Sequence, residues 1–211
     1  MELKEAVETL LKNATKRNFI QTVNLTINLK GVDLKNPKNR IDEEITLPNG
    51  KGKPVKVAMF ATGELAFKAR NVAELVLTDE DIQRLKENKR EAKKIAGNYD
   101  FFLAETSLMS RIGKDLGAVL GPRGKMPKPI PSNAEPSAVV NSLKKSVKAR
   151  TKNTPTISIP VGREDMDVDR VCENITAALS KIESKLEKGK DNIDNVYISL
   201  TMSDSLKVDR W

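Results

Sequence analysis

The chain has 211 residues, 38% of them hydrophobic, and 37 Lys and Arg against 29 Asp and Glu give it a formal net charge of +8. It contains no histidine and only one cysteine, which excludes histidine-based catalysis, histidine metal ligands and an internal disulfide. No apolar run approaches the roughly 20 residues of a membrane-spanning helix, and the charged N-terminus is unlike a signal peptide. The positive charge favours a polyanionic partner such as nucleic acid.

The first elements are an amphipathic helix and a half-buried strand. Residues 2–17 carry apolar side chains at helical spacing, which predicts the helix. From residue 22 the pattern changes to period two, with one row of Val and Leu or Ile and an opposite row of Thr and Asn up to Lys30. This alternation predicts a strand over 22–30 with one face toward solvent. A second strand is expected over 41–48.

After a linker at 49–54, strands alternate with helices. Apolar runs predict buried strands, and amphipathic runs predict helices, of which the one at 79–97 begins after Thr78 as its cap. The strands are expected at 55–61, 72–78 and 99–105, and the helices at 64–70, 79–97, 107–121 and 136–148. This alternation is typical of a parallel sheet covered by helices on both faces.

The last part resembles the first in character, with a strand at 155–162, a helix at 167–189 and strands at 195–202 and 205–211. The predicted fold is therefore an α+β domain formed by both termini, residues 1–50 and 149–211, with an inserted doubly wound, Rossmann-like α/β domain at 51–148. The segment 51–148 contains 19 Lys and Arg and 11 Asp and Glu, a net charge of +8, which leaves the rest of the chain neutral.

The stretch LGPRGKMPKPIP at 120–131 is a stiff, cationic loop. Its glycines let backbone N–H groups approach an anion, and Arg123, Lys125 and Lys128 supply positive charge. It is not a nucleotide P-loop, because Val119 stands where that motif needs glycine and Met126 where it needs Ser or Thr. A nucleotide-binding α/β module or enzyme remains the alternative that the inserted fold suggests, and a protein-only adaptor is a third possibility.

Other candidate sites have ordinary structural explanations. Cys172 lies on the apolar stripe of its helix, where a small buried side chain is expected. The acids at 162–169 precede a helix, and there carboxylates cap N–H groups and complement the dipole more often than they bind metal. The row of Thr and Asn at 22–28 is different, since short polar side chains suit ribose hydroxyls and phosphate oxygens, although an ordinary wet sheet face explains it equally well.

Three stretches together resemble the ribosomal protein L1 family, the large-subunit stalk proteins, in its archaeal form. They are RNFIQTV at 17–23, GKDLGAVLGPRGKMPKP at 113–129 and VYISLTMSDSLKV at 196–208, with IPVG at 159–162 in support. The resemblance implies a non-enzymatic protein without cofactor or metal, located in the cytoplasm within the large ribosomal subunit and monomeric when free. It also implies binding to a stem-loop region of large-subunit ribosomal RNA, release of deacylated tRNA from the exit site, and repression of translation through its own mRNA.

The resemblance places the main RNA surface on the domain formed by the termini, although the charge count favours the insert. It assigns RNA contacts to Phe19, Thr22, Thr201 and Met202. Asn28 falls where some members have lysine, and Ser203 where the usual pattern is Thr-Met-Gly. Position and charge add Lys30, Arg40, Arg150, Lys152 and Arg163 as hypotheses. The loop is expected to make secondary RNA contacts through Gly121, Arg123, Gly124, Lys125 and Lys128.

Overall fold

The computed structural model describes residues 1–34, 36, 39–151 and 153–209. The chain has a mixed α and β fold and splits into two compact units. Unit 1 consists of residues 1–53 and 145–211, and unit 2 of residues 54–144. None of the helices among these described residues is long and apolar enough to cross a membrane.

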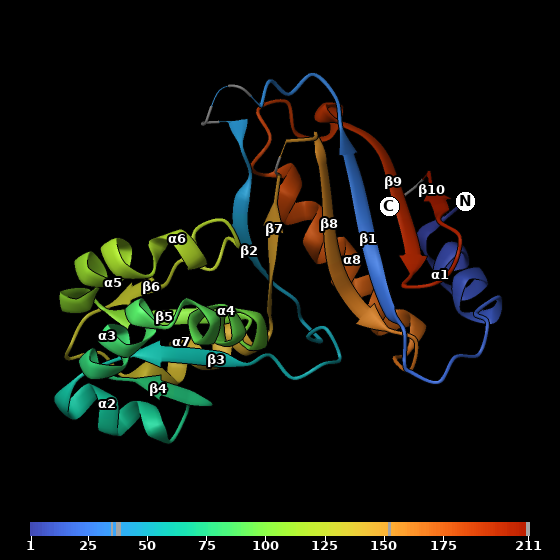
Figure 1. Cartoon of the computed structure of the whole chain (residues 1–211). Helices are drawn as coiled ribbons and strands as arrows, with labels where there is room; N and C mark the ends of the chain where they lie inside the picture. Colours follow the sequence, from blue (N-terminus) through green and yellow to red (C-terminus); the bar gives the residue numbers. More distant parts are fainter. Residues whose placement is uncertain (35, 37–38, 152, 210–211) are drawn as a thin grey trace. The chain divides into compact units, whose positions relative to one another are not determined.

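Unit 1 contains two antiparallel sheets and two main helices (Figure 1). A four-stranded sheet has the order β10-β9-β1-β8, and β2 pairs with β7 in a two-stranded sheet. The elements of this unit are α1 Leu3–Lys12, β1 Thr22–Leu29, β2 Asp42–Thr46, β7 Ser146–Arg150, β8 Thr156–Arg163, α8 Val168–Glu183, the 3₁₀ turn Gly189–Asn192, β9 Ile193–Leu200 and β10 Leu206–Val208.

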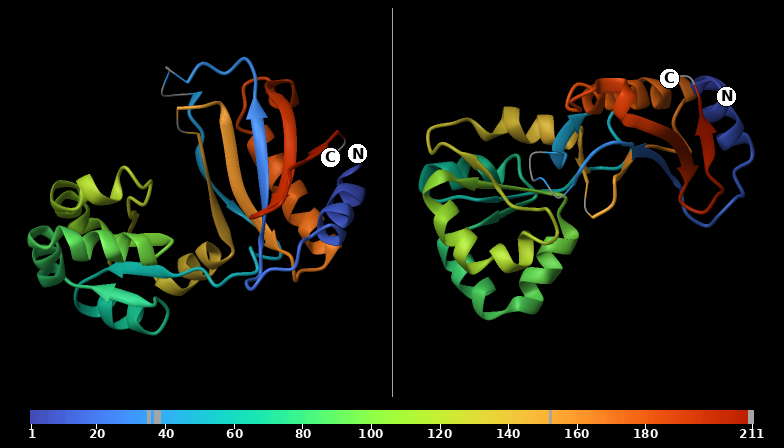
Figure 2. Two further views of the ribbon diagram at one scale, coloured as in Figure 1. Left: turned by 45° about the vertical axis from the view of Figure 1, so that its right-hand side comes forward. Right: turned by 90° about the horizontal axis from the view of Figure 1, so that it is seen from above.

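Strand β1 is central in the four-stranded sheet and shows the expected alternation. Val23, Leu25, Ile27 and Leu29 are buried, while the polar residues between them are half-exposed. The buried row packs against α1 and α8, which lie on the same side of the sheet (Figure 2). The opposite face of the sheet carries the polar row, and therefore one face holds the core of unit 1 while the other meets solvent.

Strand β7 corrects the expected boundary between the domains. The helix expected over 136–148 ends at Lys144, and Ser146–Arg150 form a strand that pairs with β2. Val147 and Ala149 are buried, while Lys148 and Arg150 are only partly buried, a period-two signal that lysines at the end of a helical pattern concealed. The boundary therefore lies near residue 145 instead of 148.

The corrected boundaries change the charge count. Residues 54–144 contain 15 Lys and Arg and 11 Asp and Glu, a net charge of +4, and the rest of the chain contains 22 and 18, also +4. Lys51, Lys53, Lys145 and Lys148 make the difference, because they belong to unit 1. The expected concentration of all net charge in the insert is wrong, and the two units carry equal net charge.

Unit 2 is a parallel sheet of order β4-β3-β5-β6 with helices on both faces. One apolar cluster lies between the sheet and α3 to α6, and another between the sheet and α2 and α7. The elements are β3 Val57–Phe60, α2 Gly63–Arg70, β4 Leu75–Leu77, α3 Asp79–Glu87, α4 Lys89–Asn98, β5 Phe101–Glu105, the 3₁₀ turn Thr106–Leu108, α5 Met109–Asp115, α6 Gly117–Leu120, β6 Lys128–Ile130 and α7 Pro136–Lys144.

Two expected helices are each divided in the structure. The helix over 79–97 breaks at Asn88, whose non-helical ψ of 79° ends α3 and whose side chain accepts a hydrogen bond from the Glu91 N–H to begin α4. The helix over 107–121 divides at Leu116 into α5 and α6. Part of the 120–131 loop forms β6 at the edge of the sheet, where proline is tolerated because no neighbour needs its missing N–H.

Candidate nucleic-acid interface

The start of β1 and the end of β9 meet at one end of the unit 1 sheet, although they are separated by most of the chain. Val23 pairs with Leu200. One residue further, the Thr201 hydroxyl accepts a hydrogen bond from the Thr22 N–H at 3.1 Å and contacts the Thr22 carbonyl at 3.4 Å as donor. The Thr201 side chain thus extends the pairing of β1 and β9 by one residue and holds Thr22 and Thr201 together.

Gln21 organises the same end and was missed by the sequence analysis. Its side chain, 1% exposed, accepts a hydrogen bond from the Met202 N–H at 3.1 Å and donates one to the Thr15 carbonyl at 3.2 Å. The sequence did contain a signal: position 21 continues the row of odd, buried positions of β1, yet it holds a polar residue. A buried amide with both ends bonded positions the groups around it.

The turn from β9 to β10 accommodates Ser203 without strain. Its hydroxyl accepts a hydrogen bond from the Leu200 N–H at 3.0 Å, and its own N–H bonds the Leu200 carbonyl at 3.4 Å. Among the described residues only glycines have positive φ, so this position does not require a glycine conformation. The serine in place of the usual glycine adds a hydroxyl that closes the turn.

Large apolar side chains are exposed beside this hydrogen-bonded framework. Phe19 is 49% and Met202 57% exposed, and Ile20 is also exposed. Phe19 lies two residues before Gln21, whose side chain bonds the Met202 backbone, so these groups belong to the same end of β1. Exposed aromatic and apolar side chains held by a rigid frame are suited to contacts with unstacked bases. We call Phe19, Ile20, Thr22, Thr201 and Met202 the strand-end surface.

Arg163 lies next to this surface, since it pairs with Thr22 across β1 and β8. Its guanidinium donates to the Gly52 carbonyl at 3.0 Å and lies 3.6 Å from the Asp165 carboxylate. Gly52 has φ of +73°, a backbone conformation that favours glycine, and a Cβ there would also crowd the side chains of Met166 and Arg163. The Arg163 guanidinium is therefore already bonded to groups of the protein, which makes it a weaker candidate for RNA contact than its charge alone indicates.

The polar face of the sheet extends away from the strand-end surface. Thr26 lies opposite Ser158 on β8 and Tyr197 on β9, and Lys207 on β10 lies opposite Tyr197. The Thr156 hydroxyl donates to the Asn28 carboxamide oxygen at 3.1 Å. The Thr and Asn row recognised on β1 is therefore one row of a wider polar face. Its members on the other strands could be placed only once the pairing register was known.

The remaining expected contacts lie at the far end of β1, roughly 25 Å from Thr22 at the usual strand rise. Asn28 and Lys30 are there. Arg40 donates to the Leu34 carbonyl at 2.9 Å, and Arg150 lies 3.8 Å from Asp42. The expected residues thus form two groups instead of one. Lys152 lies outside the described residues.

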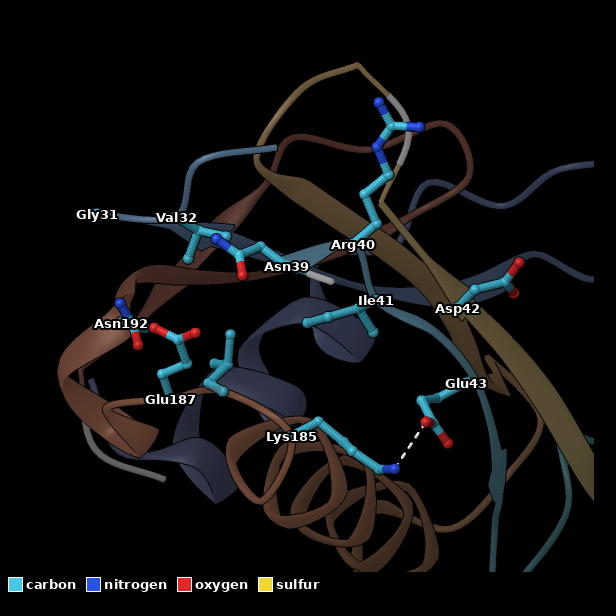
Figure 3. Close-up of a pocket in the computed structure, with 11 residues that line it drawn as sticks. Gly31, Val32, Asn39, Arg40, Ile41, Asp42, Glu43, Lys185, Glu187 and Asn192 are labelled. Atoms are coloured by element: carbon cyan, nitrogen blue, oxygen red, sulfur yellow. Dashed lines mark ion pairs between the residues drawn. The ribbon is translucent and has the colours of Figure 1, made fainter. Parts of the chain in front are cut away.

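A pocket of about 310 Å³ opens near this far end, lined by Arg40, Asp42, Glu43, Lys185 and Asn192 among others (Figure 3). Lys185 and Glu43 form an ion pair at 2.7 Å across part of it. The Arg40 guanidinium points away from the other labelled side chains. The pocket thus contains charges of both signs, and Lys185 and Glu43 already neutralise each other. Its lining therefore does not select a particular ligand.

In unit 2, Lys125, one of the residues expected to contact RNA, also has a structural role. Its ammonium donates to the carbonyls of Ala96 at 2.9 Å and Tyr99 at 2.6 Å, so it caps the C-terminal end of α4. Gly124, with φ of +67°, provides the turn that brings Lys125 there. An added Cβ at Gly121 would lie 2.8 Å from the Gly117 carbonyl oxygen. Arg123 and Lys128 are exposed and remain candidates for RNA contact.

The position at which a doubly wound sheet binds nucleotides is occupied by a carboxylate of the protein itself. The switch point lies between β3 and β5, outside their C-terminal ends. There Glu105, 7% exposed, accepts hydrogen bonds from the N–H and hydroxyl of Thr62 at 3.1 and 2.7 Å and from the hydroxyls of Ser107 and Ser132 at 2.8 and 2.9 Å.

These hydrogen bonds, above all the one from the Thr62 side chain, lower the pKa of Glu105 from its usual 4.5 to about 2 despite the opposing effect of burial. The group is therefore an anion at neutral pH, and it already accepts the N–H and hydroxyl groups that a phosphate would need. This arrangement argues against the alternative of a nucleotide-binding module.

The other candidate sites also have structural explanations. Cys172 is half-buried against the unit 1 core, and burial raises the pKa of its thiol. Asp165, Asp167 and Asp169 pair with Arg163, Arg170 and Lys4. Asp167 precedes α8, but its side chain caps no N–H group, so ion pairing replaces the expected capping. No cluster of three possible metal ligands occurs within the ranges that the structure covers.

Comparison with known proteins shows which family this chain belongs to. A model of the Ribosomal protein L1p/L10e family matches residues 10–204. The chain belongs to this family of ribosomal proteins. The large ribosomal subunit protein uL1 of Thermoplasma volcanium is 48% identical over 98% of this chain and 95% of its own length. The uL1 proteins of Methanothermobacter thermautotrophicus and Archaeoglobus fulgidus are each 44% identical over 98% of this chain and 98% and 97% of their own lengths.

The family assignment confirms the resemblance inferred from the three sequence stretches, including its archaeal type. It also agrees with the expectation of a non-enzymatic protein, because the relatives are named as ribosomal proteins and not as enzymes. Members of such a family are components of ribonucleoprotein particles.

Proposed function

We propose that this chain binds large-subunit ribosomal RNA through the strand-end surface and the adjoining polar face of the unit 1 sheet. The observation that carries the proposal is the double hydrogen bond between Thr201 and Thr22. Together with the Gln21 bond to Met202, it holds exposed apolar groups from both ends of the chain in one place. A preformed surface loses little entropy on binding.

The composition of this surface supports recognition of RNA shape. Its strand-end residues are neutral, and the face beyond them presents hydroxyls and amides from Thr, Ser, Asn and Tyr side chains. Such groups hydrogen-bond ribose hydroxyls and phosphate oxygens, while Phe19 and Met202 cover unstacked bases. The strand-end surface would supply the specific contact, with Lys30 and Lys207 adding charge at the margins of the face.

Finer roles, which the resemblance to the family implies, complete the proposal. Unit 1 would be the RNA-binding domain formed by both termini, and unit 2 an inserted domain whose loop makes secondary RNA contacts through Arg123 and Lys128. The protein would reside in the cytoplasm within the large ribosomal subunit, forming the mobile stalk near the tRNA exit site and assisting release of deacylated tRNA. A similar stem-loop in its own mRNA would occupy the same surface and repress translation, with the free protein monomeric.

The test is chemical footprinting of the purified full-length chain on large-subunit ribosomal RNA, with Thr201→Ala and Met202→Asp as variants. We expect one protected stem-loop region with the unaltered protein and loss of that protection with both variants. A leader fragment of its own mRNA should compete for the same site. Protection at many unrelated positions, or a unique site that both variants retain, would contradict the proposal.

Equilibrium dialysis against ATP, GTP and NAD separates this function from the nucleotide-binding alternative. We expect no retention of any of the three, because Glu105 occupies the switch point. Retention of one nucleotide that is lost on Thr62→Val would favour the alternative. Failure to retain RNA at moderate salt would favour a protein-only adaptor.

A further inference from the structure

The outer face of α4 carries an unusual concentration of cations. Lys89, Arg90, Lys93 and Lys94 are all exposed, and residues four apart lie above one another on a helix, so they form two adjacent rows. The inward face of the helix is made by Ala92 and Ala96, which are buried. The exposed side chains from Lys89 to Lys94 are thus all cationic, over about 8 Å of helix.

These four cations have no ion-pair partner among the described residues, whereas three cations on the neighbouring helices α3 and α5 do. Arg84 lies 3.1 Å from Glu91, Lys86 lies 3.0 Å from Asp115, and Arg111 contacts Asp79 and Asp115. Other helices of the chain place opposite charges four residues apart, as in Glu8–Lys12 and Glu64–Lys68. The one acid of α4, Glu91, faces Arg84 and leaves the outer face without a counter-charge.

This arrangement is unfavourable for the isolated fold. Lys89 and Lys93, and likewise Arg90 and Lys94, are like charges four residues apart, which lowers helix stability. Lys89 and Arg90 also lie in the first turn of α4, where the helix dipole disfavours positive charge. Folding does not explain why the chain accumulates cations here, and an anionic partner does.

Gly97 continues the row of Lys89 and Lys93 at the next turn. It is exposed, and an added Cβ would meet nothing within 4 Å, so packing inside the protein does not require glycine. Glycine weakens a helix compared with alanine. Its place in the cationic row leaves the helix backbone open to close approach by a partner.

We infer that the outer face of α4 is a second RNA contact, which binds the sugar-phosphate backbone independently of sequence. The face bears no apolar side chain of the kind that a membrane-surface helix inserts or that forms the centre of a protein interface. Rows of flexible cations at this spacing suit successive phosphates. The inference rests on the proposed function, since it assumes that RNA is the partner of the whole chain.

The test measures the affinity of the full-length chain for large-subunit ribosomal RNA as a function of salt. One variant carries Lys89→Gln, Arg90→Gln, Lys93→Gln and Lys94→Gln, which keep helix propensity and remove four charges. A matched control removes four exposed cations elsewhere through Lys12→Gln, Lys68→Gln, Lys181→Gln and Lys188→Gln. We expect the α4 variant to bind roughly tenfold or more weakly at 100 mM salt, with a salt slope smaller by about 2–4, while the control changes little.

The outcomes separate this inference from the proposed function. An α4 variant that keeps the unique footprint and has the same salt slope as the control would overturn the inference alone. Absence of any unique footprint with the unaltered protein would overturn the proposed function. Loss of binding to phosphatidylglycerol vesicles without loss of RNA affinity would assign the face to a membrane and also overturn the inference. Circular dichroism should show an unchanged fold, with an equal or higher melting temperature.

Lysine protection provides an independent readout. Acetylation of the RNA complex with a water-soluble ester should label Lys181 as in the free protein, but leave Lys89, Lys93 and Lys94 protected. Equal labelling of these three lysines in the free and bound states would contradict contact through α4.

Discussion

The two units carry the same net charge of +4 but use their cations differently. In unit 1, Lys148 and Arg150 share Asp42, and Lys185 pairs with Glu43. The surface proposed for specific binding consists of neutral polar and apolar groups held by hydrogen bonds. In unit 2, the outer face of α4 leaves four cations unpaired. Net charge therefore does not distinguish the two proposed surfaces, one of which is neutral and the other cationic.

This difference predicts a division of work. Short polar side chains and exposed apolar groups recognise a particular RNA shape, and their contribution should depend little on salt. Unpaired cations interact with any phosphate backbone, and their contribution should fall steeply as salt rises. Variants in the two surfaces can therefore be distinguished by how their effects respond to salt as well as by size.

The largest effect is expected from Met202→Asp. It removes an exposed apolar contact and places a carboxylate at the centre of the strand-end surface, and so the affinity for ribosomal RNA should fall by about 2–4 kcal/mol, roughly 30- to 1000-fold. Filter binding at several salt concentrations measures this loss. Phe67→Asp, at an exposed apolar residue of α2, is the control and should cost much less. Equal losses would mean that added negative charge, not position, is responsible.

Glu105→Gln should destabilise unit 2 by about 2 kcal/mol, since hydrogen bonds to a charged acceptor are stronger than those to a neutral one. A carboxyl whose folded pKa is depressed stabilises the fold above its unfolded pKa, and this contribution disappears as pH falls toward the folded value. For Glu105 that window runs from 4.5 to about 2. The free energy of unfolding of the wild-type protein, measured by urea titration, should fall as the pH decreases across this window. The free energy of unfolding of the variant should depend less on pH.

RNA affinity at neutral pH should change little in Glu105→Gln, because the residue is buried and belongs to neither proposed surface. A large loss of affinity in a folded Glu105→Gln protein would show that the loops around the switch point contact RNA. Such a result would assign specific RNA recognition to unit 2 and contradict the division between the two surfaces.

Gln21→Met should lower RNA affinity by roughly tenfold, about 1–2 kcal/mol, although Gln21 itself is buried. The variant has similar volume but leaves the Met202 N–H and the Thr15 carbonyl without their partner, which costs stability as well. Because the residue acts by positioning Met202, the effect should vanish in a Met202→Ala background. Additive losses in the double variant would show that Gln21 acts independently of Met202.

Arg123→Ala should have the smallest effect, within about 0.5 kcal/mol, since an exposed cation contributes little by itself. Its effect should disappear at high salt. The same titration that measures the α4 variant measures this one. A loss as large as that of Met202→Asp would show that the loop, and not the strand-end surface, provides the principal contact.

Sequence pattern predicted most elements and several members of the strand-end surface. Strand β1 was evident from its strict alternation, and Phe19, Thr22, Thr201 and Met202 came from family motifs. Gln21 was not predicted, because its role depends on a partner 181 positions away in the sequence. The role of Lys125 escaped for a related reason: in the sequence a lysine in a glycine-rich loop resembles an anion ligand, and only the fold shows it at the end of α4.

By itself the amino-acid sequence determined the alternation of strands and helices, the absence of histidine chemistry, the identity of the polar row on β1 and the family. Those properties depend on residue type and local spacing. The tertiary structure alone decided where the units divide, which cations are paired, and which distant residues meet at the end of the sheet. These depend on strand register and on distances of a few ångströms between groups far apart in the chain, which local periodicity does not encode.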